Sequence, residues 1–167
     1  MTSLKKIILA PFALAALAVS AQTMAATQER HTVQLEATIP SQVFHVQPVD
    51  GSWLPNTQVL NYNPVTETLE TLRKQFFAKH TAGTIEASLL TTPELQDIAS
   101  PEKIALQVSF NNTAVTTTPV EVVNAAESLA GITTFLEIKP TKPVTGYKAG
   151  IYEGNVQLAF DAVVPTP

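Results

Sequence analysis

Histidine, aspartate and glutamate are the residues of this chain that could supply acid-base chemistry or bind a metal ion. The three histidines, His31, His45 and His80, lie far apart, and none belongs to an H-x-H or H-E-x-x-H motif. Metal ligands are commonly found at such short spacings. The sequence therefore predicts histidines on strand faces or at the surface, and no metal site.

Two pairs of carboxylates are spaced closely enough to act together, Glu67 with Glu70 and Glu94 with Asp97. Acid-base catalysis also needs a cleft that shifts their pKa values. The first pair is typical of a solvated face and the second of the first turn of a helix. The chain has no G-x-S-x-G motif, no glycine-rich loop and no cysteine. We therefore expect no catalytic residue and no cofactor.

Aromatic residues could form a sugar-binding platform, and the candidates are Trp53, Tyr62, Phe76, Phe77 and Tyr147. Trp53 follows an Asp-Gly turn and precedes a proline, where exposure is plausible. Packing in the core or at its rim is the more common role of such rings, and the sequence favours it here.

The first residues are typical of a secretory signal peptide. Lys5 and Lys6 precede an apolar run of about 13 residues, which is shorter than the roughly 20 needed to span a bilayer. Small residues then follow, so we expect cleavage after Ala25, with Ala26 as the alternative, and a signal peptide at 1–25. Loss of the two lysines changes the net charge from −4 to about −6. Nucleic acid and anionic membranes are therefore not expected partners.

The remaining chain, about 142 residues, has the composition of an all-β domain. Thr and Val dominate it, while Gly and Pro separate short apolar runs. Asn111 and Asn112 are expected to form a polar hairpin turn. The predicted strands are residues 32–39, 43–46, 58–62, 84–90, 103–110, 120–123, 132–138 and 152–163.

Two segments have helical features. Residues 92–98 predict a short helical turn, with Thr92 as N-cap and Pro93 in the first helical position. Residues 67–80 carry Leu69, Leu72 and Phe76 at helical spacing. A long single helix would need a sheet face to cover, however, so tertiary context could make that segment extended.

Alternating segments occur at both ends of the chain after the signal peptide. Near the start, every second residue of 32–39 is apolar, and no strand is predicted upstream to pair with it. Near the end, residues 152–163 alternate in the same way. Their inward residues would be Val33, Leu35, Ala37 and Ile39 in the first segment and Tyr152, Gly154, Val156, Leu158, Phe160 and Ala162 in the second.

Together these features resemble the major pilins of the colonisation-factor type (CFA/I-type, class 5), the alpha branch of chaperone-usher fimbriae. The resemblance covers essentially the whole chain after the signal peptide, and the missing cysteines favour this branch. It is carried by the alternating residues 32–39, Asp50-Gly51, Leu54-Pro55, Tyr62 with Pro64, Thr92-Pro93, Leu95, Asp97, Val108-Ser109-Phe110, Gly150, Tyr152, Gly154, Val156 and Leu158.

The resemblance implies an immunoglobulin-like β-sandwich that is incomplete in the monomer and is completed by donor-strand exchange. It implies a donor strand within 26–40, with Val33, Leu35, Ala37 and Ile39 as its inward residues, and an incomplete domain at 41–167. The implied acceptor-groove residues are Tyr152, Val156, Leu158 and Phe160. The resemblance also favours an extended conformation for residues 67–80.

The function implied is that of a structural major subunit, which polymerises head to tail with identical subunits into adhesive surface fibres. Its implied partners are a periplasmic chaperone, an outer-membrane usher and a tip adhesin, and its route runs through the periplasm to the cell surface. Two alternatives remain open: a minor pilin, and a secreted monomeric β-sandwich that binds a ligand such as a carbohydrate.

Overall fold

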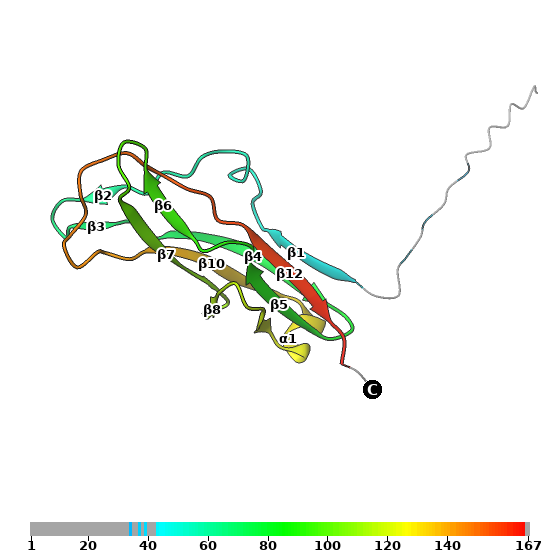
Figure 1. Ribbon diagram of the computed structural model, residues 1–167. Helices are drawn as coiled ribbons and strands as arrows, with labels where there is room; N and C mark the ends of the chain where they lie inside the picture. The colour runs from blue at the N-terminus through cyan, green and yellow to red at the C-terminus, as the bar shows by residue number, and fades with distance from the viewer. Residues whose placement is uncertain (1–33, 35–36, 38, 40–42, 166–167) are drawn as a thin grey trace, which may run out of the picture. The chain divides into compact units, whose positions relative to one another are not determined.

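The computed structural model describes residues 34, 37, 39 and 43–165, and strands are its main regular secondary structure (Figure 1). Residues 43–165 are called the body below. The elements of the body are β1 (Phe44–Pro48), β2 (Tyr62–Asn63), β3 (Thr68–Leu69), β4 (Leu72–His80), β5 (Thr84–Leu89), β6 (Glu94–Asp97), β7 (Lys103–Phe110), β8 (Thr113–Val115), β9 (Val120–Val123), α1 (Ala125–Ala130), β10 (Ile132–Pro140), β11 (Tyr152–Glu153) and β12 (Leu158–Val163).

The strands form two main sheets, in which all paired strands are antiparallel. The larger sheet has the order β1-β4-β10-β7-β6-β11, with β8 paired to β7, and the smaller has the order β12-β5-β9. Strands β2 and β3 form a separate ribbon. No helix in the described part of the chain is long and apolar enough to cross a membrane.

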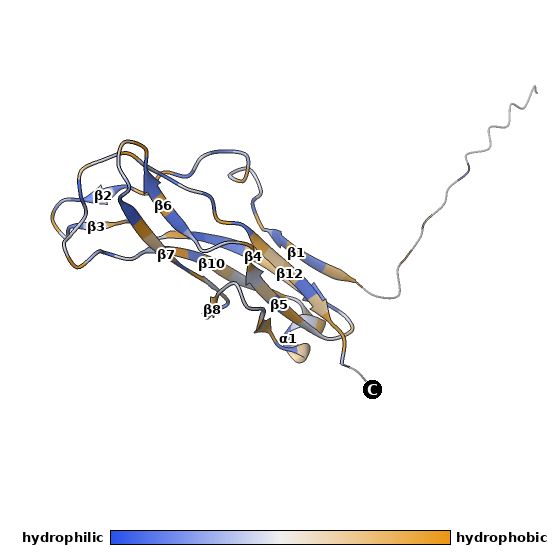
Figure 2. Cartoon of the chain, viewed as in Figure 1, coloured by the Kyte–Doolittle hydropathy of each residue, from blue (hydrophilic) through white to orange (hydrophobic). Residues whose placement is uncertain are grey.

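Alternating burial along the strands builds one core between these sheets. In β7 the buried residues are Ile104, Leu106, Val108 and Phe110, and those between them are exposed or half-buried. This is the period of two expected of a strand with one face in a core, and Figure 2 shows bands of apolar and polar residues along the strands. The core combines side chains of β4, β7, β8 and β10 with those of β5 and β9, so the domain is a β-sandwich, as predicted.

The predictions for 103–110 and 120–123 match β7 and β9 in both bounds. The extended conformation favoured for residues 67–80 is also confirmed, because β3 and β4 occupy most of this segment. Its helical spacing was misleading: strand β4 pairs with β1 on one side and β10 on the other, and those pairings override helix propensity.

The helical turn predicted at 92–98 is wrong, because residues Glu94–Asp97 form β6. Glu94, Leu95 and Gln96 pair with residues of β7, and Asp97 pairs with Tyr152 of β11. The Thr-Pro-acid pattern that often starts a helix is also compatible with a strand, here because β6 pairs with β7 on one side and β11 on the other. The strand predicted at 58–62 is also mostly wrong, since only Tyr62 lies in a strand.

The strand predicted at 152–163 is interrupted. Residues 154–157 are irregular, and they connect β11 in the larger sheet to β12 in the smaller one. Gly154 permits this crossing, because a Cβ atom there would lie 2.2 Å from the carbonyl oxygen of Glu94. The alternating pattern therefore belongs to a chain that changes sheets, which the pattern alone does not reveal.

Helix α1 was not predicted from the sequence. Its N-cap is Asn124, whose side-chain oxygen accepts a hydrogen bond from the N–H of Glu127 at 3.0 Å. Gly131 ends the helix with φ of 83°. The buried Ser128 donates a hydrogen bond to the carbonyl of Gly83, which ties the helix to the β4–β5 connection.

The predicted turn at Asn111 and Asn112 is confirmed, with φ values of 51° and 61° in the β7–β8 hairpin. Asn111 has a second role. Its Nδ2 donates to the carbonyl of Val122 at 2.8 Å, and its Oδ1 accepts from the hydroxyl of Thr134, also at 2.8 Å. The side chain therefore joins this hairpin to β9 and β10.

We predict that Asn111→Ala lowers the free energy of unfolding by about 2 kcal/mol, because it strains a left-handed residue and leaves two buried partners unsatisfied. Urea unfolding of the purified subunit would measure the change. Asn112→Gly is the matched control: Asn112 is exposed, and glycine adopts the same φ without strain, so the change should stay within about 0.5 kcal/mol. Equal effects of both variants would contradict the joining role of Asn111.

Candidate functional site

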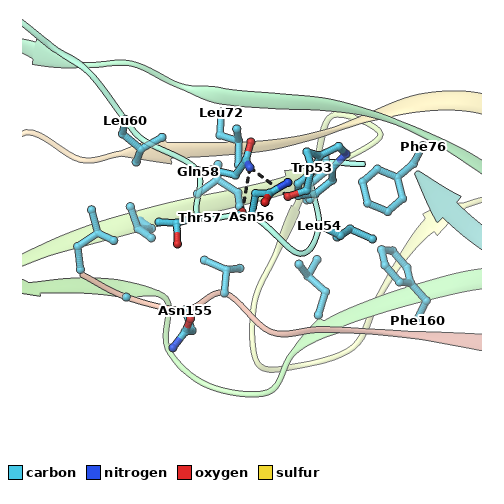
Figure 3. Close-up of a pocket in the computed structure, with 17 residues that line it drawn as sticks. Trp53, Leu54, Asn56, Thr57, Gln58, Leu60, Leu72, Phe76, Asn155 and Phe160 are labelled. Atoms are coloured by element: carbon cyan, nitrogen blue, oxygen red, sulfur yellow. Dashed lines mark hydrogen bonds between the residues drawn. The ribbon is translucent and has the colours of Figure 1, made fainter. Parts of the chain in front are cut away.

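An apolar groove with a volume of about 470 Å³ opens between two segments of the body (Figure 3). Its first wall is formed within residues 53–60, and its second wall within residues 154–160. Its floor comes from the larger sheet, as Leu72 and Phe76 of β4, Leu95 of β6, Leu106 of β7, and Leu136 and Ile138 of β10. The groove is thus an opening in the side of the sandwich, through which solvent reaches the core.

Aromatic rings fill one end of this groove. The ring of Phe160 lies 4.8 Å from that of Phe110 and 6.4 Å from that of Phe76, between centroids. Trp53 meets Phe76 edge-on at 6.2 Å. Phe110 is fully buried, whereas Phe160 is only half-buried. The core continues into the groove without a covering layer at Phe160.

Side-chain hydrogen bonds hold the first wall in a compact loop. The amide of Gln58 donates to the carbonyls of Trp53, at 3.1 Å, and Asn56, at 3.0 Å, as drawn in Figure 3. Upstream, the carboxylate of Asp50 accepts from the N–H of Ser52, and the hydrogen bonds with Ser52 lower the pKa of Asp50. The wall is therefore shaped before anything binds in the groove.

The second wall carries a free sheet edge. Within the described residues, β12 pairs with β5 on one side and with no strand on the other. Leu158 and Phe160 direct their side chains into the groove, while the unpaired edge presents backbone N–H and C=O groups beside it. An exposed edge of this kind is a template for another strand. The arrangement of apolar floor and open edge suits an extended peptide with alternating apolar residues.

Asp97 fixes the segment that leads into the second wall. Its carboxylate accepts from the hydroxyl of Ser100 at 2.6 Å and from the N–H of Ile151 at 3.1 Å. The pKa of Asp97 is lowered mainly by the bond from Ser100, against an opposing effect of burial, and further by backbone N–H groups including that of Ile151. Gly150 is required here, because a Cβ atom would lie 2.6 Å from the Asp97 carboxylate.

The structure brings together three of the four residues expected in an acceptor groove: Val156, Leu158 and Phe160 line it. Tyr152 does not, and lines two hollows further along the same wall. Of the expected donor residues, Ala37 and Ile39 are exposed, and the side chain of Ile39 is 90% accessible. Val33, Leu35 and the cleavage positions Ala25 and Ala26 lie outside the described residues.

Sequence reasoning did not assign the floor or the first wall to a groove. Trp53 and Phe76 stood out only as aromatic residues, and the leucines of the floor have the spacing of ordinary core positions. The described histidines take part in packing: His45 lies against Phe77, and the buried His80 lies against Phe44. Among residues 34, 37, 39 and 43–165, no cluster of three or more His, Asp or Glu could hold a metal ion.

A β-sandwich with an open apolar groove beside an unpaired sheet edge is the architecture of subunits that assemble by strand addition. The sequence model of the family described as "CS1 type fimbrial major subunit" matches residues 29–161. The chain belongs to this family, and it is a structural major subunit of a fimbria, or pilus, of the chaperone-usher kind. Membership implies polymerisation with identical subunits into a fimbria on the cell surface.

Comparison with solved structures agrees on the fold. The chain is similar to the CooA pilin subunit from enterotoxigenic Escherichia coli, with a TM-score of 0.60 and 21% sequence identity over 71% of this chain and 86% of that one. At this identity the likeness extends to the fold. No curated protein matched the sequence of this chain.

We predict that Asp97→Asn destabilises the body at neutral pH and that the difference from wild type shrinks in acid. A depressed pKa means that the ionised carboxylate stabilises the fold above its unfolded pKa of about 4, and that this contribution is lost as the pH falls below that value. Urea unfolding of both proteins between about pH 7 and pH 2.5 would measure the difference. Ser100→Ala should reproduce part of the neutral-pH effect, and an unchanged difference across this range would contradict the assignment.

Proposed function

We propose that each subunit inserts its N-terminal segment into the groove of the adjacent subunit, and that this donated strand joins the subunits of the fibre. The donor residues are Val33, Leu35, Ala37 and Ile39. The observation that carries the proposal is the apolar groove beside the unpaired edge of β12. The strand would supply the missing edge partner, and its alternate side chains would cover the floor.

The burial of side chains makes such a junction strong. Covering Val33, Leu35 and Ile39 contributes about 1.5 to 3 kcal/mol each, or about 5 to 9 kcal/mol before the cost of ordering the segment. Backbone hydrogen bonds to the edge of β12 add to this. The groove residues Phe160, Leu72 and Leu95, which are only half-buried in the subunit, would also lose contact with water.

The topology of the body supports one direction for the donated strand. Strand β1 starts beside His80, and β12 ends beside Thr84, so both lie at one end of the body, here called the near end. The far end carries β2, β3 and the loop before β11 (Figure 1). A donor antiparallel to β12 would leave the groove at the far end, and each body would then follow the previous one in line. A parallel donor would crowd two neighbours at the near end.

Export and assembly complete the proposal. The signal peptide at 1–25 would direct the chain to the periplasm, where a chaperone would cover the groove until an outer-membrane usher adds the subunit to the fibre. A tip adhesin subunit would end the fibre and give it adhesive function. An incomplete sandwich needs such protection, because its open edge would otherwise pair with other chains.

We predict that Leu35→Asp abolishes fibres while leaving export intact. A carboxylate without a partner in the apolar groove would weaken the junction by about a hundredfold or more. Electron microscopy and gels of unheated surface extracts would measure fibre length. Gln34→Asp is the matched control, because its side chain points away from the groove in the proposed strand and fibres should persist. Fibres of normal length from Leu35→Asp would overturn the proposed donor strand.

A further inference from the structure

All three tyrosines of the chain, Tyr62, Tyr147 and Tyr152, line one hollow at the far end of the body. This tyrosine hollow has a volume of about 470 Å³ and is completed by apolar Leu69 and Ile104. The rings of Tyr62 and Tyr147 meet edge-on at 6.1 Å, and the hydroxyl of Tyr152 donates to the carbonyl of Lys148 at 3.1 Å. The ring arrangement is thus held by contacts within the body.

Charge on this rim is neutralised locally. Lys148 pairs with Glu102, and Lys142 pairs with Glu67 at 2.9 Å. The hollow therefore offers aromatic surface and not a charged site. Tyr62 is nevertheless half exposed, at 50%, so this aromatic surface is open to an apolar occupant.

The tyrosine hollow is continuous with the groove. A third cavity, of about 600 Å³, lies between them and shares Tyr62 and Tyr152 with the hollow. It also shares Leu60, Leu95 and Gly154 with the groove. A strand that lies in the groove and continues toward the far end would therefore run directly into the tyrosine hollow.

We propose that the Ile39-Pro40 end of the adjoining subunit's N-terminal segment occupies this tyrosine-lined extension of the groove, with Ile39 opposite Gly154. The inference rests on the proposed donor strand and adds its register. Antiparallel pairing then places Ala37 opposite Val156, Leu35 opposite Leu158 and Val33 opposite Phe160. Four inward donor residues thereby meet four alternate positions of the second wall.

The chemistry of Ile39 and Pro40 fits this place. Opposite Gly154, Ile39 lies beside Leu60 and Leu95, which line the cavity at this point. Proline has no N–H to donate, so strand pairing ends at Pro40. Rigid, apolar proline rings bind well in aromatic-lined grooves. The residue before a proline also favours an extended backbone, which keeps Ile39 in the strand.

Paired cysteines test the register in assembled fibres, because the natural chain has none. Ala37→Cys with Val156→Cys places two directly opposed residues within disulfide distance in the proposed register. Ala37→Cys with Leu158→Cys, and Leu35→Cys with Val156→Cys, report slips of two residues in either direction. After mild oxidation, non-reducing gels should show a covalent ladder of subunits from the first pair alone.

The outcomes separate the two proposals. A ladder from either slipped pair would overturn the register and keep the donor strand. Fibres that give no ladder from any of the three pairs would overturn the donor strand as well. Single-cysteine variants, which should form no more than dimers, control for chance contacts between fibres.

A double-mutant cycle tests the contact with tyrosine. Tyr62→Ser should speed dissociation of fibres in denaturant about tenfold, since it removes one aromatic face, while Tyr62→Phe should leave the rate unchanged. In a Pro40→Ala background, the effect of Tyr62→Ser should largely disappear, because its contact is already lost. An equal effect of Tyr62→Ser in both backgrounds would overturn the proposed contact between Pro40 and the tyrosine hollow.

Discussion

The unpaired edge of β12 is the constraint on which the rest of this structure depends. The smaller sheet has three strands and the larger has seven, so the smaller sheet does not cover the whole apolar face of its partner. The aromatic cluster of Phe76, Phe110 and Phe160 connects the two sheets, with Phe76 and Phe110 in the larger sheet and Phe160 in the smaller one. Its outer ring remains half-buried. Hydrophobic burial in the subunit is therefore incomplete, and a strand from outside would extend the same core.

Polar contacts hold both walls of the groove in place. Gln58 fixes the first wall through two carbonyls, and Asp97 fixes the approach to the second through Ser100 and Ile151. Such preorganisation lowers the entropy that binding must overcome, because only the incoming segment has to become ordered. It also replaces the disulfides that the chain, without cysteine, does not have.

A strand with one buried face was predictable from sequence, as β7 shows, because a core on one side of the strand makes apolar and polar residues alternate. Strand β6 was not, since Thr92 and Pro93 also fit a helix start and only long-range pairing with β7 and β11 decides between the two. Three residues of the second wall, Val156, Leu158 and Phe160, were expected from the family resemblance, which placed the alternating segment 152–163 in the groove. The first wall and floor come from segments far apart in sequence, and no spacing rule joins Trp53 to Leu136.

The ends of the body explain why a donated strand would give a fibre and not a closed pair. The donor would leave from the near end, where β1 begins, whereas the groove extends to the far end, where the tyrosines lie. The two surfaces in contact are therefore different, and a contact of this heterologous kind repeats without closing unless its rotation forms a ring. Binding of Pro40 in the tyrosine hollow at the far end would also fix the angle between successive bodies. The contact of Pro40 with the tyrosines would then set both the register of the donor strand in the groove and the geometry of the fibre.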